Sequence, residues 1–152
     1  MKELKGDLLD LAMQGEFDVI VHGCNCFCNM GAGIAKTIKT QFPEAFAVDK
    51  TTLPADLTKL GTYSKACIQR SNKEFVIINA YTQFDWRGKG LKADYVAIRN
   101  VFAKIRDEFP GLRIGYPLIG AGLAGGDWES IASIIDEELF DMDHTLVRFD
   151  VL

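Results

Sequence analysis

Twice along the chain, a short apolar strand pattern leads through a glycine-rich loop into a helix pattern. In the first segment, the run 19–21 is followed by polar residues, Gly31 and Gly33, and then by helical periodicity. In the second, residues 113–117 lead into the glycine-rich stretch 119–126. An all-apolar strand is buried on both faces, as central strands of α/β sheets are. The pattern therefore predicts a sheet with helices on both sides.

The rest of the chain alternates between the two periodicities. Apolar runs and turn residues predict strands at 3–5, 17–21, 61–69, 75–80, 113–117 and 146–151. Residues recurring every three or four positions predict helices at 8–13, 34–42, 44–50, 95–109 and 128–140, with a polar loop at 82–90. This order is typical of a three-layer α/β/α fold with a mixed, largely parallel sheet.

Length, composition and charge indicate how many domains the chain forms and which kinds of partner it can bind. With 152 residues, 48% of them hydrophobic and 25% charged, we expect one domain spanning residues 1–152. The longest apolar runs are too short to cross a bilayer and the start resembles no signal peptide, so we expect a cytoplasmic protein without membrane contact. The net charge of −4 disfavours wrapping of duplex nucleic acid but permits a small anionic ligand. We expect a monomer that needs no cofactor.

Three of the four cysteines alternate within five residues, at Cys24, Cys26 and Cys28. Zinc sites usually combine a C-x-x-C pair with a second pair elsewhere, and here only Cys67 and two histidines remain to complete a shell. The spacing therefore favours reduced thiols over a metal site or a disulfide.

The first glycine-rich loop is typical of an anion-binding site. A helix N-terminus offers unpaired N–H groups and a partial positive charge, and glycines let the backbone approach a phosphate closely. His22, Asn25 and Asn29 are expected to border the anion. Because loops that follow parallel strands share one rim of a sheet, we expect both glycine-rich loops to face one crevice, where they suit a diphosphate.

Two common nucleotide-binding motifs do not fit. Ala35 stands where a Walker motif needs glycine, which disfavours ordinary nucleotide hydrolysis. Gly120, Gly122 and Gly125 match G-x-G-x-x-G, but the chain ends before a second half of a dinucleotide fold, which disfavours nicotinamide chemistry.

The first loop carries a family resemblance. It resembles the macrodomains, which bind ADP-ribose and its derivatives, and among them the yeast-type ADP-ribose 1″-phosphate phosphatase. The matching positions are His22, Cys24, Asn25, Cys26, Gly31, Gly33, Ile34 and Ala35. The resemblance implies a three-layer macrodomain fold.

The later segments resemble a second branch, the antitoxin and terminal ADP-ribose glycohydrolase macrodomains. Residues 77–79, Thr82, Trp86, Arg87 and the stretch 120–128 match that branch. It places a catalytic lysine directly after the threonine, where this chain has Gln83, and glutamine has no basic nitrogen to attack a sugar carbon. Lys89 and Lys92 lie nearby, but lysines in a polar loop are expected to be solvated. Ala124 replaces an acidic residue that some glycohydrolases carry.

The resemblance implies roles for individual residues. His22 would transfer a proton beside the terminal phosphate, the alternative being a histidine that only hydrogen-bonds the backbone, and Asn25 would bind the distal ribose, the alternative being a turn residue. Asp7 would accept from adenine, cap the following helix, or do both, whereas Asp127 is expected mainly to cap a helix. The expected ligand-binding residues are Asp7, Leu8, Gly31, Ala32, Gly33, Ile34, Tyr81, Ile119, Gly120, Ala121, Gly122, Leu123, Ala124 and Gly125.

The sequence does not identify the residue that stacks on the adenine base. Tyr81 ends a predicted strand and is a candidate for stacking, whereas Phe149 is expected in the core. Asp150 stands where related families carry an aromatic residue.

Three functions follow as hypotheses. The first is a hydrolase that removes phosphate from ADP-ribose 1″-phosphate. The second is an ADP-ribosyl hydrolase without the catalytic lysine, and the third is a reader that binds free ADP-ribose, or a macromolecule carrying it, without turnover.

Overall fold

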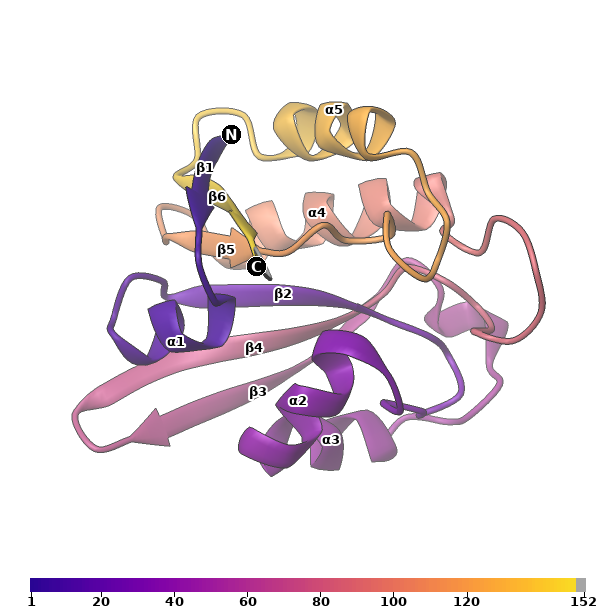
Figure 1. Ribbon diagram of the computed structural model, residues 1–152, viewed down its shortest axis with the longest axis horizontal. Coiled ribbons are helices and arrows are strands. Elements are labelled where there is room, and N and C mark those ends of the chain that lie inside the picture. Colours follow the sequence, from indigo (N-terminus) through magenta and orange to yellow (C-terminus); the bar gives the residue numbers. More distant parts are fainter. Residues whose placement is uncertain (150–152) are drawn as a thin grey trace.

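A six-stranded sheet lies between two layers of helices in the computed structural model, which describes residues 1–149 (Figure 1). The strands are β1 (Lys2–Lys5), β2 (Val19–Cys24), β3 (Tyr63–Arg70), β4 (Lys73–Tyr81), β5 (Ile114–Tyr116) and β6 (His144–Arg148). The helices are α1 (Leu8–Met13), α2 (Gly33–Gln41), α3 (Pro43–Lys50), α4 (Tyr95–Glu108) and α5 (Trp128–Glu138), with a 3-10 turn η1 (Leu57–Lys59).

The sheet has the order β1-β6-β5-β2-β4-β3. Five of its strands are parallel, and β3 runs antiparallel to β4, to which a tight turn joins it. Ser71 in that turn has a φ of 53°, a left-handed conformation that short hairpin turns require. The predicted mixed, largely parallel sheet is confirmed.

Two separate cores lie on the two faces of the sheet. In β2, Val19 and Val21 pack toward α4 and α5, while Ile20 packs toward α1, α2 and α3. Figure 1 shows the same division, with α4 and α5 above the sheet and the first three helices below it. All three side chains are buried because successive residues of a strand point to opposite faces. This explains the continuous apolar run in the sequence.

Most boundaries differ from the prediction by one or two residues, and the largest difference is in β2. β2 extends past Val21 to Cys24, because pairing of His22 with Asn79 continues the ladder to β4. The turn η1 was not predicted. The last strand begins at His144 instead of 146, and the end predicted for it at 150–151 lies outside the described residues.

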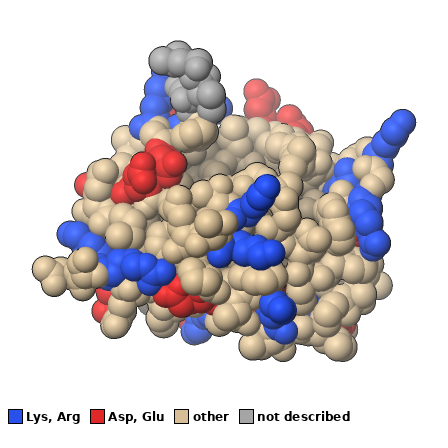
Figure 2. Space-filling model, turned by 60° about the horizontal axis from the view of Figure 1, so that its bottom comes forward, with Lys and Arg blue, Asp and Glu red and all other residues tan. Residues whose placement is uncertain are grey.

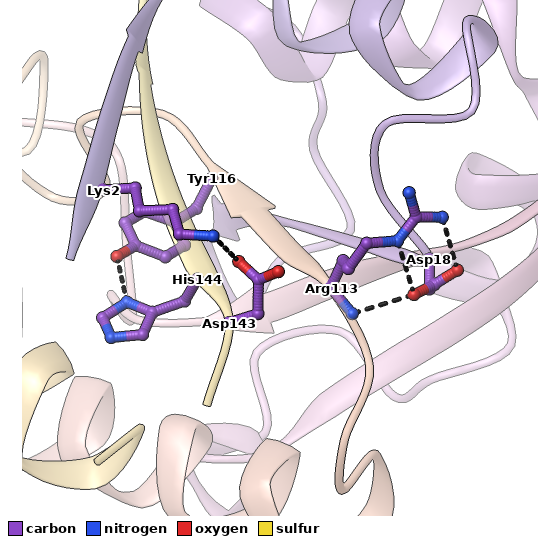
Figure 3. Close-up of polar contacts among 6 residues, drawn as sticks. All are labelled: Lys2, Asp18, Arg113, Tyr116, Asp143 and His144. Atoms are coloured by element: carbon purple, nitrogen blue, oxygen red, sulfur yellow. Dashed lines mark hydrogen bonds and ion pairs between the residues drawn. The ribbon is translucent and has the colours of Figure 1, made fainter. Parts of the chain in front are cut away.

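The amino ends of the central strands are fixed by polar contacts (Figure 3). The Asp18 carboxylate accepts from the backbone N–H, the Nε and the Nη2 of Arg113, at 2.8 to 3.1 Å. The guanidinium lowers the pKa of Asp18. Further along β5, the Tyr116 hydroxyl lies 2.7 Å from His144 Nδ1 on β6. These contacts link β2 to β5 and β5 to β6, and because the three strands are parallel, the loops after them leave the same edge of the sheet.

Within residues 1–149, no helix is long and apolar enough to cross a bilayer.

Candidate functional site

A cavity of about 640 Å³ opens at the carboxyl ends of four parallel strands. Its wall is formed by residues that follow β2, β4 and β5 and by the end of β6. The lining residues are Gly23, Cys24, Asn25, Asn29, Gly31, Ala32, Gly33, Ile34, Ala35, Thr82, Gln83, Trp86, Gly88, Lys92, Pro117, Leu118, Ile119, Gly120, Gly122, Leu123, Ala124, Val147 and Phe149. This edge is where ligands of α/β sheets bind.

Both glycine-rich loops line this one cavity, as the sequence predicted. Gly33, which begins α2, has a φ of 59°, and Gly120, which follows β5, has a φ of 74°. Both values lie in the left-handed region that favours glycine. The loops lie side by side because β2 and β5 are neighbours in the sheet.

Each loop presents backbone N–H groups without an intramolecular partner. α2 has no side-chain cap, and the amides of Gly33, Ile34 and Ala35 donate to no described residue. In the second loop, the amides of 122–124 are equally unpaired within the described part of the chain. Unpaired amides at the start of a helix and in a tight loop attract anions. Two groups of such donors facing one space fit a diphosphate better than a single phosphate.

The shape of the second loop depends on close backbone packing. The Gly126 amide donates to the Gly120 carbonyl at 2.7 Å, and that of Gly125 donates to the Gly122 carbonyl at 3.0 Å. A Cβ on Gly126 would lie 2.5 Å from the Gly120 oxygen, so only glycine fits without a backbone shift. A Cβ on Gly122 would meet no atom within 4 Å, because this residue faces open space.

Asn25 shapes the first loop and also lines the cavity. Its Oδ1 accepts from the Phe27 amide at 2.9 Å, and its Nδ2 donates to the Asn29 carbonyl at 2.8 Å. Each end of the amide keeps one further hydrogen-bonding position. Its turn role and a ligand role are therefore compatible. The left-handed residue of this loop is Cys28, with a φ of 57°.

The structure corrects the expected place of His22. The residue is 1% exposed and is not part of the cavity wall. Its Nε2 lies 2.7 Å from Asn79 Oδ1, and burial lowers its pKa to about 4. Side chains alternate along β2, so His22 points into the layer of α3, where Asn79 donates to the Ala45 carbonyl. A neutral, enclosed imidazole has no access to a ligand in the cavity.

Tyr81 also belongs to this interior and not to the cavity wall. It is 1% exposed, and its hydroxyl lies 2.7 Å from Asp49 Oδ1 and 2.8 Å from Ser64 Oγ. Burial raises the pKa values of both Tyr81 and Asp49. A chain of hydrogen bonds continues through Ser64 to Asn79 and His22. Two predicted site residues thus serve one buried polar network.

Asp7 and Leu8 do not line the cavity either. Asp7 caps α1, its Oδ1 accepting from the amides of Leu9 and Asp10. Leu8 is buried in the core below the sheet. The capping alternative for Asp7 is confirmed, and its contact with a base stays a prediction.

Val147 and Phe149 form the end of the cavity at β6, where Asp7, Leu8 and Tyr81 do not contribute. Phe149 was predicted in the core, and this is wrong, because 67% of the residue is exposed. The sequence could not show this, since an aromatic residue at the end of a short strand fits either place. Asp150 lies outside the described residues.

Three further expectations concern the second loop. Ala121, which packs against the upper core, and Gly125, which lies on the backbone of Gly90, are not part of the cavity wall. Asp127 caps α5 by accepting from the amide and hydroxyl of Ser130, as predicted.

The loop after β4 supplies wall residues that the sequence did not place. Ala93 forms a bridge with Gln83, and the amides of Lys92 and Ala93 donate to the Ala124 carbonyl at 2.8 and 3.2 Å. The loop is thereby folded back onto the second glycine-rich loop. Lys92, expected to be solvated, is half-buried and lines the cavity, whereas Lys89 is exposed. No periodicity in the sequence signals these contacts.

The cysteines and histidines are not grouped as metal ligands in the described part of the chain. All four cysteines are free thiols, and only Cys24 lines the cavity. Burial raises the pKa of the Cys24 thiol. Within residues 1–149, no group of three or more His, Cys, Asp or Glu side chains is arranged to hold an ion.

The charge around the cavity is sparse. Among the described residues of its wall, Lys92 is the one charged side chain, and there is no carboxylate. Over the wider surface shown in Figure 2, Lys and Arg gather at several separate places and not in one continuous patch. A second hollow, of about 430 Å³ beside Tyr63, is bordered by Lys104 and by two carboxylates, Asp107 and Glu108, which make it a poorer site for an anion.

A family model and one curated relative match this chain over most of its length, and a second relative matches a short part of it. The model of the Macro domain family matches residues 21–135. An uncharacterized 17.5 kDa protein of the tk-vs intergenic region of enterobacteria phage T4 is 34% identical over 158 residues, which span 100% of this chain and 98% of that protein. The ADP-ribose 1″-phosphate phosphatase of Aspergillus oryzae is 42% identical over 48 residues, which span 32% of this chain and only 22% of that enzyme.

Solved structures share the fold. The macrodomain of Mycobacterium tuberculosis DarG superposes with a TM-score of 0.74 at 22% identity, covering 95% of this chain and 96% of that one. Thermosipho africanus DarTG, solved in complex with ADP-ribose, superposes with a TM-score of 0.72 at 18% identity, covering 97% of this chain and 42% of that one.

Proposed function

The chain belongs to the macro domain family, and from this premise and the cavity's geometry we propose that it binds ADP-ribose. The observation that carries the proposal is that two sets of backbone amides, at 33–35 and 122–124, have no partner among the described residues and border one cavity. A diphosphate has oxygens on two adjacent phosphorus atoms and can accept from both groups at once. The structure of DarTG with ADP-ribose, which has the same fold, supports the choice of ligand.

The order of the strands suggests how the ligand lies. The glycine-rich loops follow β5 and β2, in the middle of the cavity, so the diphosphate binds there. The exposed ring of Phe149, at the β6 end, suits stacking on adenine. Asn25 and Gln83, toward the β4 end, suit the hydroxyls of the terminal ribose, because amides both donate and accept. Gln83 Oε1 is buried without a partner among the described residues, so it awaits a donor.

As a second candidate function, we propose removal of phosphate from ADP-ribose 1″-phosphate. The partial match to the Aspergillus oryzae phosphatase and the His-x-Cys-Asn-Cys order of the first loop support it. His22 has no place in this mechanism, because it lies in the interior. Asn25 would orient the attacking water, and Lys92 and the unpaired amides would stabilise the charge that develops on the phosphate. A reader function differs only in the absence of turnover.

Calorimetric titration with ADP-ribose tests the first proposal. We expect micromolar binding by the natural chain and strong weakening in Gly122→Val, whose side chain enters open space at the cavity and leaves the packing intact. Ser133→Val, on the exposed side of α5, is the control. Lack of ADP-ribose binding by the natural chain would refute the proposal.

Phosphate release from ADP-ribose 1″-phosphate tests the second. We expect release that is lost in Asn25→Ala and kept in His22→Gln. Binding of the compound without any release would identify a reader.

A further inference from the structure

Lys92 has an unusual position for a lysine in a polar loop. It is half-buried in the cavity wall, where the other described residues carry no charge. None of the ion pairs among residues 1–149 includes it. An ammonium group that lines a cavity and has no carboxylate partner is available to an anion from outside the chain.

Other cations of the same loop do not share this position. Arg87 is engaged by Asp85, with Nε 3.0 Å and Nη2 2.9 Å from the two carboxylate oxygens. Lys89 is exposed and is not part of the wall. Lys92 is therefore the cation of this loop that a ligand in the cavity can reach.

The backbone around Lys92 is fixed from two sides. The Lys92 amide donates to the Ala124 carbonyl, and the Asp94 amide donates to the Thr82 carbonyl at 2.8 Å. The bridge between Gln83 and Ala93 closes the loop between these bonds. The lysine is thereby held in the cavity wall between the end of β4 and the second glycine-rich loop.

We propose that Lys92 recognises an anionic group, such as a phosphate, attached to the terminal ribose of the ligand. The inference rests on the proposed binding of ADP-ribose, because that binding places the terminal ribose at the β4 end. Unsubstituted ADP-ribose carries only a neutral hydroxyl there, whereas a phosphate gives the ammonium a charged partner. A charge-assisted hydrogen bond at a half-buried site corresponds to a preference of about tenfold for the anionic ligand.

Calorimetry with two ligands tests the proposal. One is ADP-ribose, and the other is ADP-ribose with a 1″-methylenephosphonate, whose P–C bond is not hydrolysed. The variants are Lys92→Met, which keeps the length of the side chain, Lys92→Arg, which keeps the charge, and Lys89→Met, a matched control in the same loop. We expect the natural chain, Lys92→Arg and Lys89→Met to prefer the phosphonate, and the preference to shrink as salt rises.

In Lys92→Met, the preference should disappear, while affinity for ADP-ribose changes by less than about twofold. A preference that survives in Lys92→Met would overturn the inference. Equal weakening of both ligands would also overturn it, because it would assign Lys92 to the diphosphate. If the natural chain binds neither ligand, the proposed function itself fails. This result can be told from a surviving preference and from equal weakening, because in both of those outcomes the natural chain still binds ADP-ribose.

Discussion

Gly126→Ala should damage the second glycine-rich loop without touching a ligand. The new Cβ would lie 2.5 Å from the Gly120 carbonyl oxygen and 2.8 Å from Ile131 Cδ1. The isoleucine can rotate away, but the carbonyl belongs to the backbone and accepts from the Gly126 amide at 2.7 Å. The loop must therefore move, and overpacking of this kind costs about 1–3 kcal/mol.

Urea denaturation and thermal melting measure this cost. We expect the free energy of unfolding to fall by about 2 kcal/mol, which corresponds to a decrease of about 4–8 °C in melting temperature for a chain of this size. ADP-ribose affinity should fall at least about tenfold, because the amides of 122–124 move with the loop. Gly122→Ala, whose Cβ meets no atom within 4 Å, should be about as stable as the natural chain.

The reasoning about this loop is refuted if Gly126→Ala unfolds at the same urea concentration as the natural chain. A loss of stability with unchanged ADP-ribose affinity would separate the loop from the binding site.

Three further predictions concern the buried network and the cavity end. The pKa of His22 is lowered to about 4 from 6.5, so between these values the folded state binds fewer protons than the unfolded state. The free energy of unfolding should therefore fall as pH falls from 6.5 toward 4. His22→Gln should reduce this pH dependence, as measured by urea denaturation at several pH values. Tyr81→Phe leaves the buried Asp49 carboxyl without its donor and should cost about 1–3 kcal/mol of stability, with ADP-ribose affinity unchanged in calorimetry. Phe149→Ala should leave the melting temperature unchanged and weaken ADP-ribose binding about threefold to tenfold, whereas an unchanged affinity would argue against stacking.

The layers and the largely parallel character of the sheet could be inferred from local patterns. The run 19–21 is apolar throughout because both faces of β2 are covered, and the spacing of Ile34, Ile38 and Phe42 marks a helix with one buried side. The glycines after β2 and β5 stand where loops leave the same edge of a parallel sheet. For this reason, the meeting of the two loops was predictable without coordinates.

The direction of individual side chains was not predictable in the same way. His22 and Cys24 lie on the same face of β2, and His22 is enclosed because the ladder to β4 continues past Val21 and pairs it with Asn79. The network from His22 to Asp49 joins residues that are far apart in the sequence. Lys92 reaches the cavity wall only because the loop after β4 folds back onto Ala124. Such contacts leave no periodic signal.

The most direct test of the account is a titration of the isotopically labelled protein with ADP-ribose, followed by amide resonances in a proton–nitrogen correlation spectrum. The account predicts that the amides of 33–35 and those of 122–124 shift together and saturate at the same ligand concentration, because one diphosphate accepts from both loops. Shifts confined to a single loop, or saturation of the two loops at different concentrations, would contradict it.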